Sequence, residues 1–254
     1  MGILERWDAQ QAAYIADREG RFAIMLDVLA LTVGEAPLVV DLACGPGSLS
    51  ARVLARFPAA RVVALDLDPL LLQVAEESLA PYADRLTLLD ADLTADDWPA
   101  AVSAAFDGEP PKAAVSTTAL HWLTPSQLVG VYAHAATLLA PGGVLLNGDH
   151  FRFSEHEHPT LHRAAGEHDA ATQRRAFADG APDWEAWWTE ARALPGGAEL
   201  GAERDRRFAA RPAPEPTTIE FQLAALRQAG FDEVAPVWQL LDFGRTSPSG
   251  SVRG

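Results

Sequence analysis

The residues of this chain that could do chemistry begin with an acid followed by a glycine-rich turn. Residues 39–50 read Val-Val-Asp-Leu-Ala-Cys-Gly-Pro-Gly-Ser-Leu-Ser, so an apolar strand ends at Asp41. A turn with Gly45 and Gly47 follows, and a helix opens near Ser48. Glycines allow turn conformations and let a ligand approach the backbone closely. This order predicts a nucleotide-sized cradle at the carboxyl end of a parallel strand.

The acid that precedes the glycines discriminates between ligands. Asp41 would repel a pyrophosphate, whereas it would attract the cationic amino group or sulfonium of S-adenosylmethionine. The dinucleotide pattern is also incomplete, because Ser50 stands in the place of its third glycine. The turn therefore favours S-adenosylmethionine over a nicotinamide dinucleotide.

Two later strands also end in acids. The apolar run 61–65 leads into Asp66, about 20 residues after the glycine turn, where a carboxylate can accept hydrogen bonds from ribose hydroxyls. That spacing alone would also suit a nicotinamide enzyme. The run 86–89 leads into Asp90 and Asp92, so a third strand end presents carboxylates to the same edge of a parallel sheet.

These three motifs resemble those of class I S-adenosylmethionine-dependent methyltransferases, over about residues 36–150 and again at 221–238. Ala43 stands where many members have a further glycine. In this family the third strand end accepts from the adenine amino group; Asp92 fits that place, with Asp90 as a weaker alternative. The resemblance implies S-adenosylmethionine as cofactor and a set of cofactor-binding residues. They are Asp41, Ala43, Gly45, Gly47, Asp66, Leu67, Asp92, Leu93, Thr117 and Tyr14.

Composition limits the partners. The 254 residues have a formal net charge of −15, with 20 Lys and Arg against 35 Asp and Glu. Nucleic-acid binding needs clustered cationic side chains, so RNA methyltransferases are disfavoured. No apolar run reaches the length of a membrane span, and the amino terminus has no signal-peptide pattern. We expect a cytoplasmic protein that acts on a small molecule, with no nucleic-acid or membrane partner; the oligomeric state is left open.

Apolar runs predict strands that alternate with helices. Strands are expected at 38–40, 61–65, 86–89, 113–117 and 144–147, and helices at 3–33, 48–56, 69–79 and 125–139, with a helix start and loop at 94–111. A last helix is expected to stop at Gly230, before a strand at about 233–241. This order implies a Rossmann-like, doubly wound, mostly parallel sheet with helices on both faces. The family resemblance implies seven strands.

The family resemblance implies that the chain has four parts. They are an N-terminal helical lid at 1–35, a cofactor-binding core at 36–150, a helical substrate cap inserted at 151–214, and a C-terminal completion of the sheet at 215–254. The family normally closes its sheet with an antiparallel hairpin, but residues 243–251 are a poor strand sequence. The last strand is therefore expected to be short, supplied differently, or replaced by a disordered tail.

The cap region contains candidate substrate residues. Trp184, Trp187 and Trp188 fall at i, i+3 and i+4 on one helix face, which suits either packing onto the core or an aromatic wall for an acceptor. His156 and His158, with nearby acids, could ligate zinc or iron. No second cluster with ligand spacing follows, and methyl transfer does not generally need a metal, so we expect no metal.

A general base should follow strand four or five, because the carboxyl ends of these strands border the cradle. His121 follows the fourth strand and His150 the fifth. Alignment of the reactants without a base is the alternative. Residues 116–119 lack the Asn/Asp-Pro-Pro-aromatic tetrad of nucleic-acid and protein amino-methyltransferases. This absence favours a small acceptor methylated at oxygen or nitrogen, and residues 119–123 resemble the trans-aconitate methyltransferase group.

Three other functions remain open at this point. The chain could bind S-adenosylmethionine without catalysis, or use it for a reaction other than methyl donation, such as an intramolecular cyclisation. A nicotinamide oxidoreductase is the third, disfavoured by Asp41 and by the missing glycine.

Overall fold

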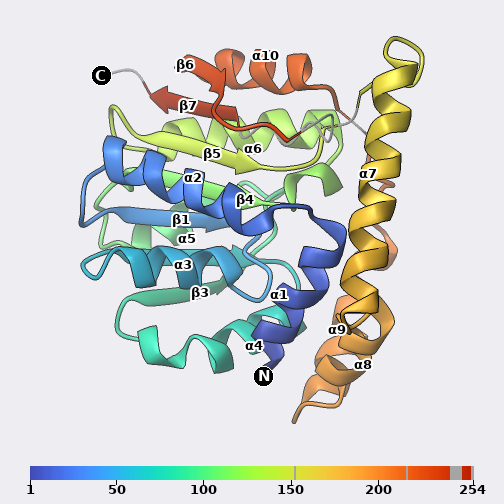
Figure 1. Cartoon of the computed structure of the whole chain (residues 1–254). Helices are drawn as coiled ribbons and strands as arrows, with labels where there is room; N and C mark the ends of the chain where they lie inside the picture. The colour runs from blue at the N-terminus through green and yellow to red at the C-terminus, as the bar shows by residue number, and fades with distance from the viewer. Residues whose placement is uncertain (152, 216, 241–247, 253–254) are drawn as a thin grey trace.

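A computed structural model describes residues 1–151, 153–215, 217–240 and 248–252, the last of these as backbone only. One seven-stranded sheet runs through the molecule in the order β3-β2-β1-β4-β5-β7-β6. The five central strands are parallel, and β7 is antiparallel to both β5 and β6. The predicted α/β fold with a doubly wound parallel sheet is confirmed. Figure 1 shows the sheet with helices in front and behind.

The strands follow the predicted apolar runs closely. They are β1 (Leu38–Leu42), β2 (Arg61–Asp66), β3 (Leu86–Asp90), β4 (Ala113–Thr117), β5 (Val144–Gly148), β6 (Phe231–Pro236) and β7 (Pro248–Val252). Three strands run beyond their predicted ends: β1 to Leu42, β2 to Asp66 and β3 to Asp90. Parallel pairing continues there in register, since Leu42 pairs with Leu65, and Asp66 with Asp90.

The helices of the core and its N-terminal extension are α1 (Ile3–Tyr14), α2 (Arg18–Thr32), α3 (Ser48–Arg56), α4 (Pro69–Ser78), α5 (Trp98–Ala105), α6 (Pro125–Leu138) and α10 (Ile219–Ala229). Between β5 and α10 come α7 (Pro159–Ala178), α8 (Trp184–Arg192) and α9 (Gly197–Ala209). Two 3₁₀ turns, η1 (Ala80–Tyr82) and η2 (Leu120–Trp122), complete the set. Gly230 ends α10 in the left-handed conformation, as the sequence predicted.

Alternating side chains of the strands bury both faces of the sheet. On β1, Val40 and Leu42 join the cluster under α5, α6 and α10, whereas Val39 joins the cluster under α2 and α3. A third cluster packs Leu70 and Val74 of α4 against α8. The first two clusters hold the sheet between two helical layers, and the third attaches α8 to the core.

Two predictions need correction. The expected single helix over 3–33 is two helices, because the chain breaks at 15–17 and Asp17 adopts a left-handed φ of 49°. The strand expected at about 233–241 is β6, which begins and ends earlier because it follows Gly230 directly. The last strand, β7, is short (Pro248–Val252) and lies between β5 and β6 in the sheet. The expected tail at 243–247 lies outside the described residues.

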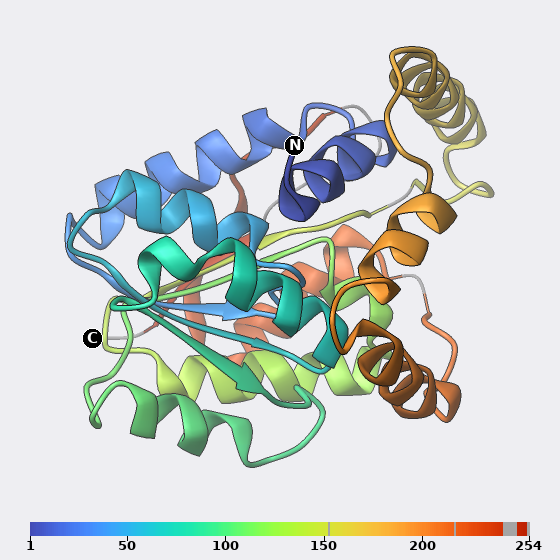
Figure 2. The same cartoon turned by 90° about the horizontal axis from the view of Figure 1, so that it is seen from below.

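The helices that surround the site stand at one end of the sheet. In Figure 1, α7, α8 and α9 lie beside the end at which the parallel strands finish, next to α1. Figure 2, seen from below, shows these three helices projecting from the core on the same side. None of the helices in the part of the chain that the structure describes is long and apolar enough to cross a membrane.

Candidate active site

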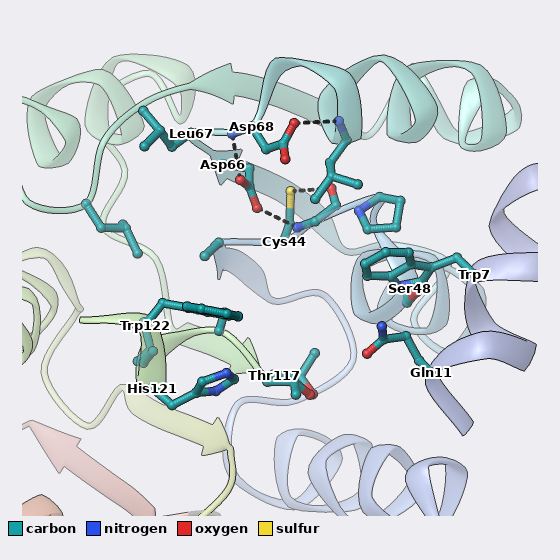
Figure 3. Close-up of a pocket in the computed structure, with 18 of the residues that line it drawn as sticks. Trp7, Gln11, Cys44, Ser48, Asp66, Leu67, Asp68, Thr117, His121 and Trp122 are labelled. Atoms are coloured by element: carbon teal, nitrogen blue, oxygen red, sulfur yellow. Dashed lines mark hydrogen bonds between the residues drawn. The ribbon is translucent and has the colours of Figure 1, made fainter. Parts of the chain in front are cut away.

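A cavity of about 420 Å³ opens at the carboxyl ends of the parallel strands. Its wall combines the loops after β1, β2, β3, β4 and β5 with side chains of α1, α2, α8 and α9. Figure 3 shows Asp66, Leu67 and Cys44 on one side of it, Trp7 and Gln11 on another, and His121 and Trp122 facing them. Ligands of open α/β sheets bind at this place, outside the strand ends.

The glycine-rich loop brings backbone rather than side chains to the cavity. Ala43, Gly45 and Gly47 have φ angles of 54°, 56° and 84°. The left-handed φ of Gly47 favours glycine at this helix start, and a Cβ there would also lie 2.5 Å from Cδ1 of Leu79, which would have to move. Ala43 and Gly45 line the cavity, whereas Gly47 lies behind it as the N-cap of α3. The predicted loop thus forms a cradle, and Gly47 shapes it without touching the cavity.

Asp66 connects the end of β2 to this loop. One carboxylate oxygen accepts from the backbone N–H of Gly45 at 2.7 Å, and the other from that of Asp68 at 2.8 Å (Figure 3). Burial raises the pKa of Asp66 to about 6 against these hydrogen bonds, and the neighbouring Asp68 also raises it. The carboxylate lies in the cavity wall with a fixed orientation, so its remaining lone pairs can accept hydroxyl groups of a ligand.

Asp41 lies beneath the loop and does not line the cavity. It is 1% exposed, and one of its oxygens accepts from Oγ of Ser50 at 2.6 Å. The other oxygen, Oδ1, has no hydrogen-bond partner among the described residues. Burial raises the pKa of Asp41 to about 7, opposed by the Ser50 hydrogen bond and assisted by the charge of Asp66. A buried carboxylate in this state favours a cation nearby.

The end of β3 presents Asp92 and Leu93 to the cavity, and Leu67 joins them from the loop after β2. Asp92 pairs with Arg211 at 2.6 Å and accepts from the backbone of Thr94. Burial would raise the pKa of Asp92, but these partners lower it. Asp90 points elsewhere and pairs with Arg207 of α9. Of the two acids weighed for the adenine amino group, Asp92 is the one in the cavity wall.

The N-terminal helices cover the cavity from the other side. Tyr14 and Trp7 of α1 line it together with Arg18 of α2. Asp8 accepts from Nη1 of Arg18 at 2.6 Å and from Oγ of Ser48 at 2.6 Å, and thereby ties α1 to α2 and to the first residue of α3. Thr117, at the end of β4, completes this part of the wall.

His121 and Asp149 form a pair that the sequence did not indicate. Asp149 is 1% exposed, and its Oδ1 lies 2.6 Å from Nδ1 of His121. Its two oxygens also accept from the backbone N–H groups of His121 and His150, both at 2.8 Å. Burial would raise the pKa of Asp149, but the charge and hydrogen bond of His121, and then His150, lower it to about 2. Asp149 is therefore an anion that holds His121.

This contact determines which ring nitrogen of His121 is basic. A hydrogen bond from Nδ1–H to the carboxylate leaves Nε2 as the basic nitrogen of the neutral ring. Both His121 and His150 line the cavity, with ring centroids 5.7 Å apart. The structure therefore brings both predicted base candidates together and joins the first of them to a buried carboxylate. The signal was hidden because Asp149 lies in the loop of the next strand, 28 residues away.

The three predicted tryptophans separate. Trp184 and Trp188 line the cavity, whereas Trp187 is fully buried and donates its indole N–H to the carbonyl of Ile3 at 3.1 Å. The ring of Trp7 contacts all three of these rings and is nearest to Trp187, with the two centroids 4.6 Å apart. Trp187 therefore packs α8 on α1, and the other two present aromatic surface to the cavity. Sequence reasoning also missed Trp122, Arg204, Phe208 and Arg211 in the wall, which no local pattern marks.

The histidines of the 150–168 region do not form a metal group. Among the described residues, no three His, Cys, Asp or Glu side chains gather closely enough to hold a metal ion. His162 donates from Nδ1 to the carbonyl oxygen of Phe153, 3.0 Å away, which ties the loop to the start of α7.

The cavity fits S-adenosylmethionine. The loop brings its backbone to the cavity at Ala43 and Gly45, and Asp66 presents an oriented carboxylate suited to ribose hydroxyls. Beneath them, Oδ1 of Asp41 is a buried carboxyl oxygen with no hydrogen-bond partner among the described residues. A carboxylate at this place suits a cationic ligand. A pyrophosphate does not suit this site, because the carboxylates of Asp41 and Asp66 would repel it.

Comparisons with known proteins agree with this site. A family described as a methyltransferase domain matches residues 39–143. A trans-aconitate 2-methyltransferase of Methylobacterium nodulans is 32% identical over 193 residues, covering 73% of this chain and 68% of that protein. A ribosomal RNA small subunit methyltransferase H of Mycolicibacterium gilvum is 40% identical over 85 residues, 31% of this chain and 23% of that protein. Human N-acetylserotonin methyltransferase, solved in complex with SAM, has a TM-score of 0.57 at 14% identity, covering 100% of this chain and 57% of that one.

The chain belongs to the class I S-adenosylmethionine-dependent methyltransferases, and S-adenosylmethionine is its cofactor. It spans just over half of the human protein's length and about a quarter of the RNA methyltransferase. The nicotinamide alternative is thereby removed.

The raised pKa values make cofactor binding depend on pH. Asp66 and Asp41, with pKa values of about 6 and about 7, hold protons in the unliganded protein below those values. A cationic cofactor favours the ionised forms, so its affinity is lost as pH falls through this range. We expect the dissociation constant for S-adenosylmethionine to rise at least tenfold from pH 8 to pH 5, measured by isothermal titration. Asp66→Asn should make the dissociation constant depend less on pH. A pH dependence as steep in this variant as in the wild type would exclude Asp66 as its source.

Proposed function

We propose that this protein transfers the methyl group of S-adenosylmethionine to an oxygen or nitrogen of a small-molecule acceptor, with His121 as general base and Asp149 positioning it. The observation that carries the proposal is the His121–Asp149 pair in the wall of the same cavity as the glycine loop and Asp66. A histidine fixed by a buried carboxylate is a common arrangement of a general base.

The cofactor would be held by the strand ends. Asp66 would accept the ribose hydroxyls, and Asp92 with Leu67 and Leu93 would meet the adenine. Asp41 would stabilise the cationic end from beneath the loop. We propose residues 1–35 as a lid over this site and residues 151–214 as a substrate cap, because α1, α8 and α9 supply much of the cavity wall.

When bound, the cofactor supplies an electrophilic methyl group. His121 would take a proton from the acceptor at Nε2, and Asp149 would stabilise the positive charge that develops on the ring. Trp7 of α1 and Trp188 of α8 would exclude water from the reaction. Alignment of the reactants in the cavity would supply the rest of the acceleration.

A small acceptor is favoured over a macromolecule. Helices of the proposed lid and cap form part of the cavity wall, and the cavity volume of about 420 Å³ is in the range of small-molecule sites. The net charge of −15 opposes binding of nucleic acid. The first relative is named for trans-aconitate, also a small molecule.

Isothermal titration with S-adenosylmethionine and with S-adenosylhomocysteine tests the cofactor half of the proposal. Micromolar binding of both by the purified protein is expected. Absence of both, in a protein shown to be folded by circular dichroism, would contradict the proposal. Formation of S-adenosylhomocysteine when an acceptor is added distinguishes an enzyme from a protein that only binds the cofactor.

A further inference from the structure

The charges in the cavity wall are already balanced. Each of the three arginines that line it, among the described residues, forms an ion pair with an aspartate at 2.6 Å; the pairs are Arg18–Asp8, Arg204–Asp68 and Arg211–Asp92. A carboxylate acceptor would therefore meet only arginines that already pair with an aspartate, among the described residues, which makes its desolvation costly.

The base in the wall also discriminates between acceptors. A carboxylic acid, with a reference pKa near 4, is ionised at neutral pH and loses no proton during methylation. A phenolic hydroxyl, with a reference pKa of about 10, retains its proton and needs a base. The His121–Asp149 pair would assist only an acceptor of the second kind.

An uncovered aromatic ring lies beside this base. Trp122 is 60% exposed, lines the cavity, and has its ring centroid 5.2 Å from that of His121 (Figure 3). Rings at such separations stack or meet edge to face. A planar molecule stacked on Trp122 would thus bring a ring substituent within reach of His121.

The remaining aromatic surface extends this wall. Trp184, 38% exposed, and Trp188 line the cavity from α8, and Trp7 lines it from α1. The guanidinium of Arg204 already lies over the ring of Trp188, 4.1 Å from its centroid. A cation therefore occupies one aromatic face in advance, which favours a neutral acceptor over an ammonium ion.

We propose that the acceptor is a neutral planar aromatic compound that is methylated at a weakly acidic hydroxyl group, with Trp122 as its stacking platform. This inference rests on the proposed methyltransferase function. The hydroxyl proton passes to Nε2 of His121, and a lone pair of the oxygen forms the bond to the methyl carbon. The carbon–sulfur bond breaks with its electron pair on sulfur, which leaves S-adenosylhomocysteine.

Four probes test the inference by isothermal titration at pH 7.5 with the protein saturated with S-adenosylhomocysteine. They are 2-naphthol, 2-naphthoate, 2-naphthylmethylamine and trans-aconitate. We expect 2-naphthol to bind at least tenfold more tightly than the anions and the ammonium ion. Trp122→Ala should weaken the binding of 2-naphthol about tenfold. Leu161→Ala, which removes an exposed apolar side chain of α7 that does not line the cavity, should leave it unchanged.

Turnover gives an independent measurement. With S-adenosylmethionine, 2-methoxynaphthalene should form faster than any ester of the two acids. Tighter binding or faster methylation of an acid or of the amine would overturn the inference, as would no binding of 2-naphthol or an affinity that Trp122→Ala leaves unchanged. Each of these results leaves the methylation of a small acceptor with S-adenosylmethionine standing. Failure of the wild-type protein to bind S-adenosylhomocysteine would instead contradict the proposed function.

Discussion

Replacing His121 with alanine is expected to lower kcat by about 10²–10⁴-fold and to leave the affinity for S-adenosylhomocysteine unchanged. The ring of His121 lines the cavity, and a carboxylate with a pKa of about 2 holds its Nδ1 at 2.6 Å. Removal of this base leaves the acceptor proton without a destination, while the cofactor contacts at the other strand ends stay intact. The measurement is S-adenosylhomocysteine formation with 2-naphthol as acceptor.

Matched variants separate this role from a structural one. His134→Ala removes a histidine of α6 that pairs with Asp96 outside the cavity, and its rate should match the wild type. Asp149→Asn should lower the rate and move the acidic limb of the pH–rate profile to lower pH, because the carboxylate stabilises the protonated ring. Loss of rate in His150→Ala rather than His121→Ala would transfer the role to the neighbouring ring. No loss in either would leave alignment alone as the source of catalysis.

Asp66→Ala is expected to weaken S-adenosylhomocysteine binding by about 1–3 kcal/mol, which is about 5–150-fold. The carboxylate accepts the N–H groups of Gly45 and Asp68, so its loss removes ligand acceptors and also loosens the glycine loop. Isothermal titration at pH 7.5 gives the affinity directly.

Asp90→Ala is the control for this variant. Asp90 pairs with Asp66 in the parallel register of β2 and β3, but it lies outside the cavity wall and binds Arg207. Its replacement should change the affinity little. An equal loss in both variants would attribute the effect to charge or stability, and no loss in Asp66→Ala would remove that residue from the cofactor site.

The sequence predicted the parts of the site that are local in the chain. The glycine loop and Asp66 were found because a strand, a turn and a helix start follow one another within a few residues. Contacts that depend on strand neighbours were missed. His121 meets Asp149 because β4 and β5 pair in register up to Thr117 and Gly148, and nothing within either segment indicates that pairing.

The helices between β5 and α10 show a second limit of sequence patterns. A helical face with Trp184, Trp187 and Trp188 was predicted, but packing decides which ring is buried, and Trp187 is the one that α1 covers. Arg204 and Arg211 reach the cavity because α9 lies against acids at the ends of two strands. Such ion pairs between distant segments leave no periodic signal.

The order of the sheet also affects how the chain can assemble. β6 joins the sheet through β7, which lies between it and β5, so β6 cannot take its place in the sheet until β7 has been synthesised. Among the described residues, all that line the cavity precede both strands in the sequence, the last of them being Arg211. The binding site can therefore form on the growing chain before the sheet is complete. Until then β5 has an unpaired edge, which leaves the nascent protein open to association through that strand.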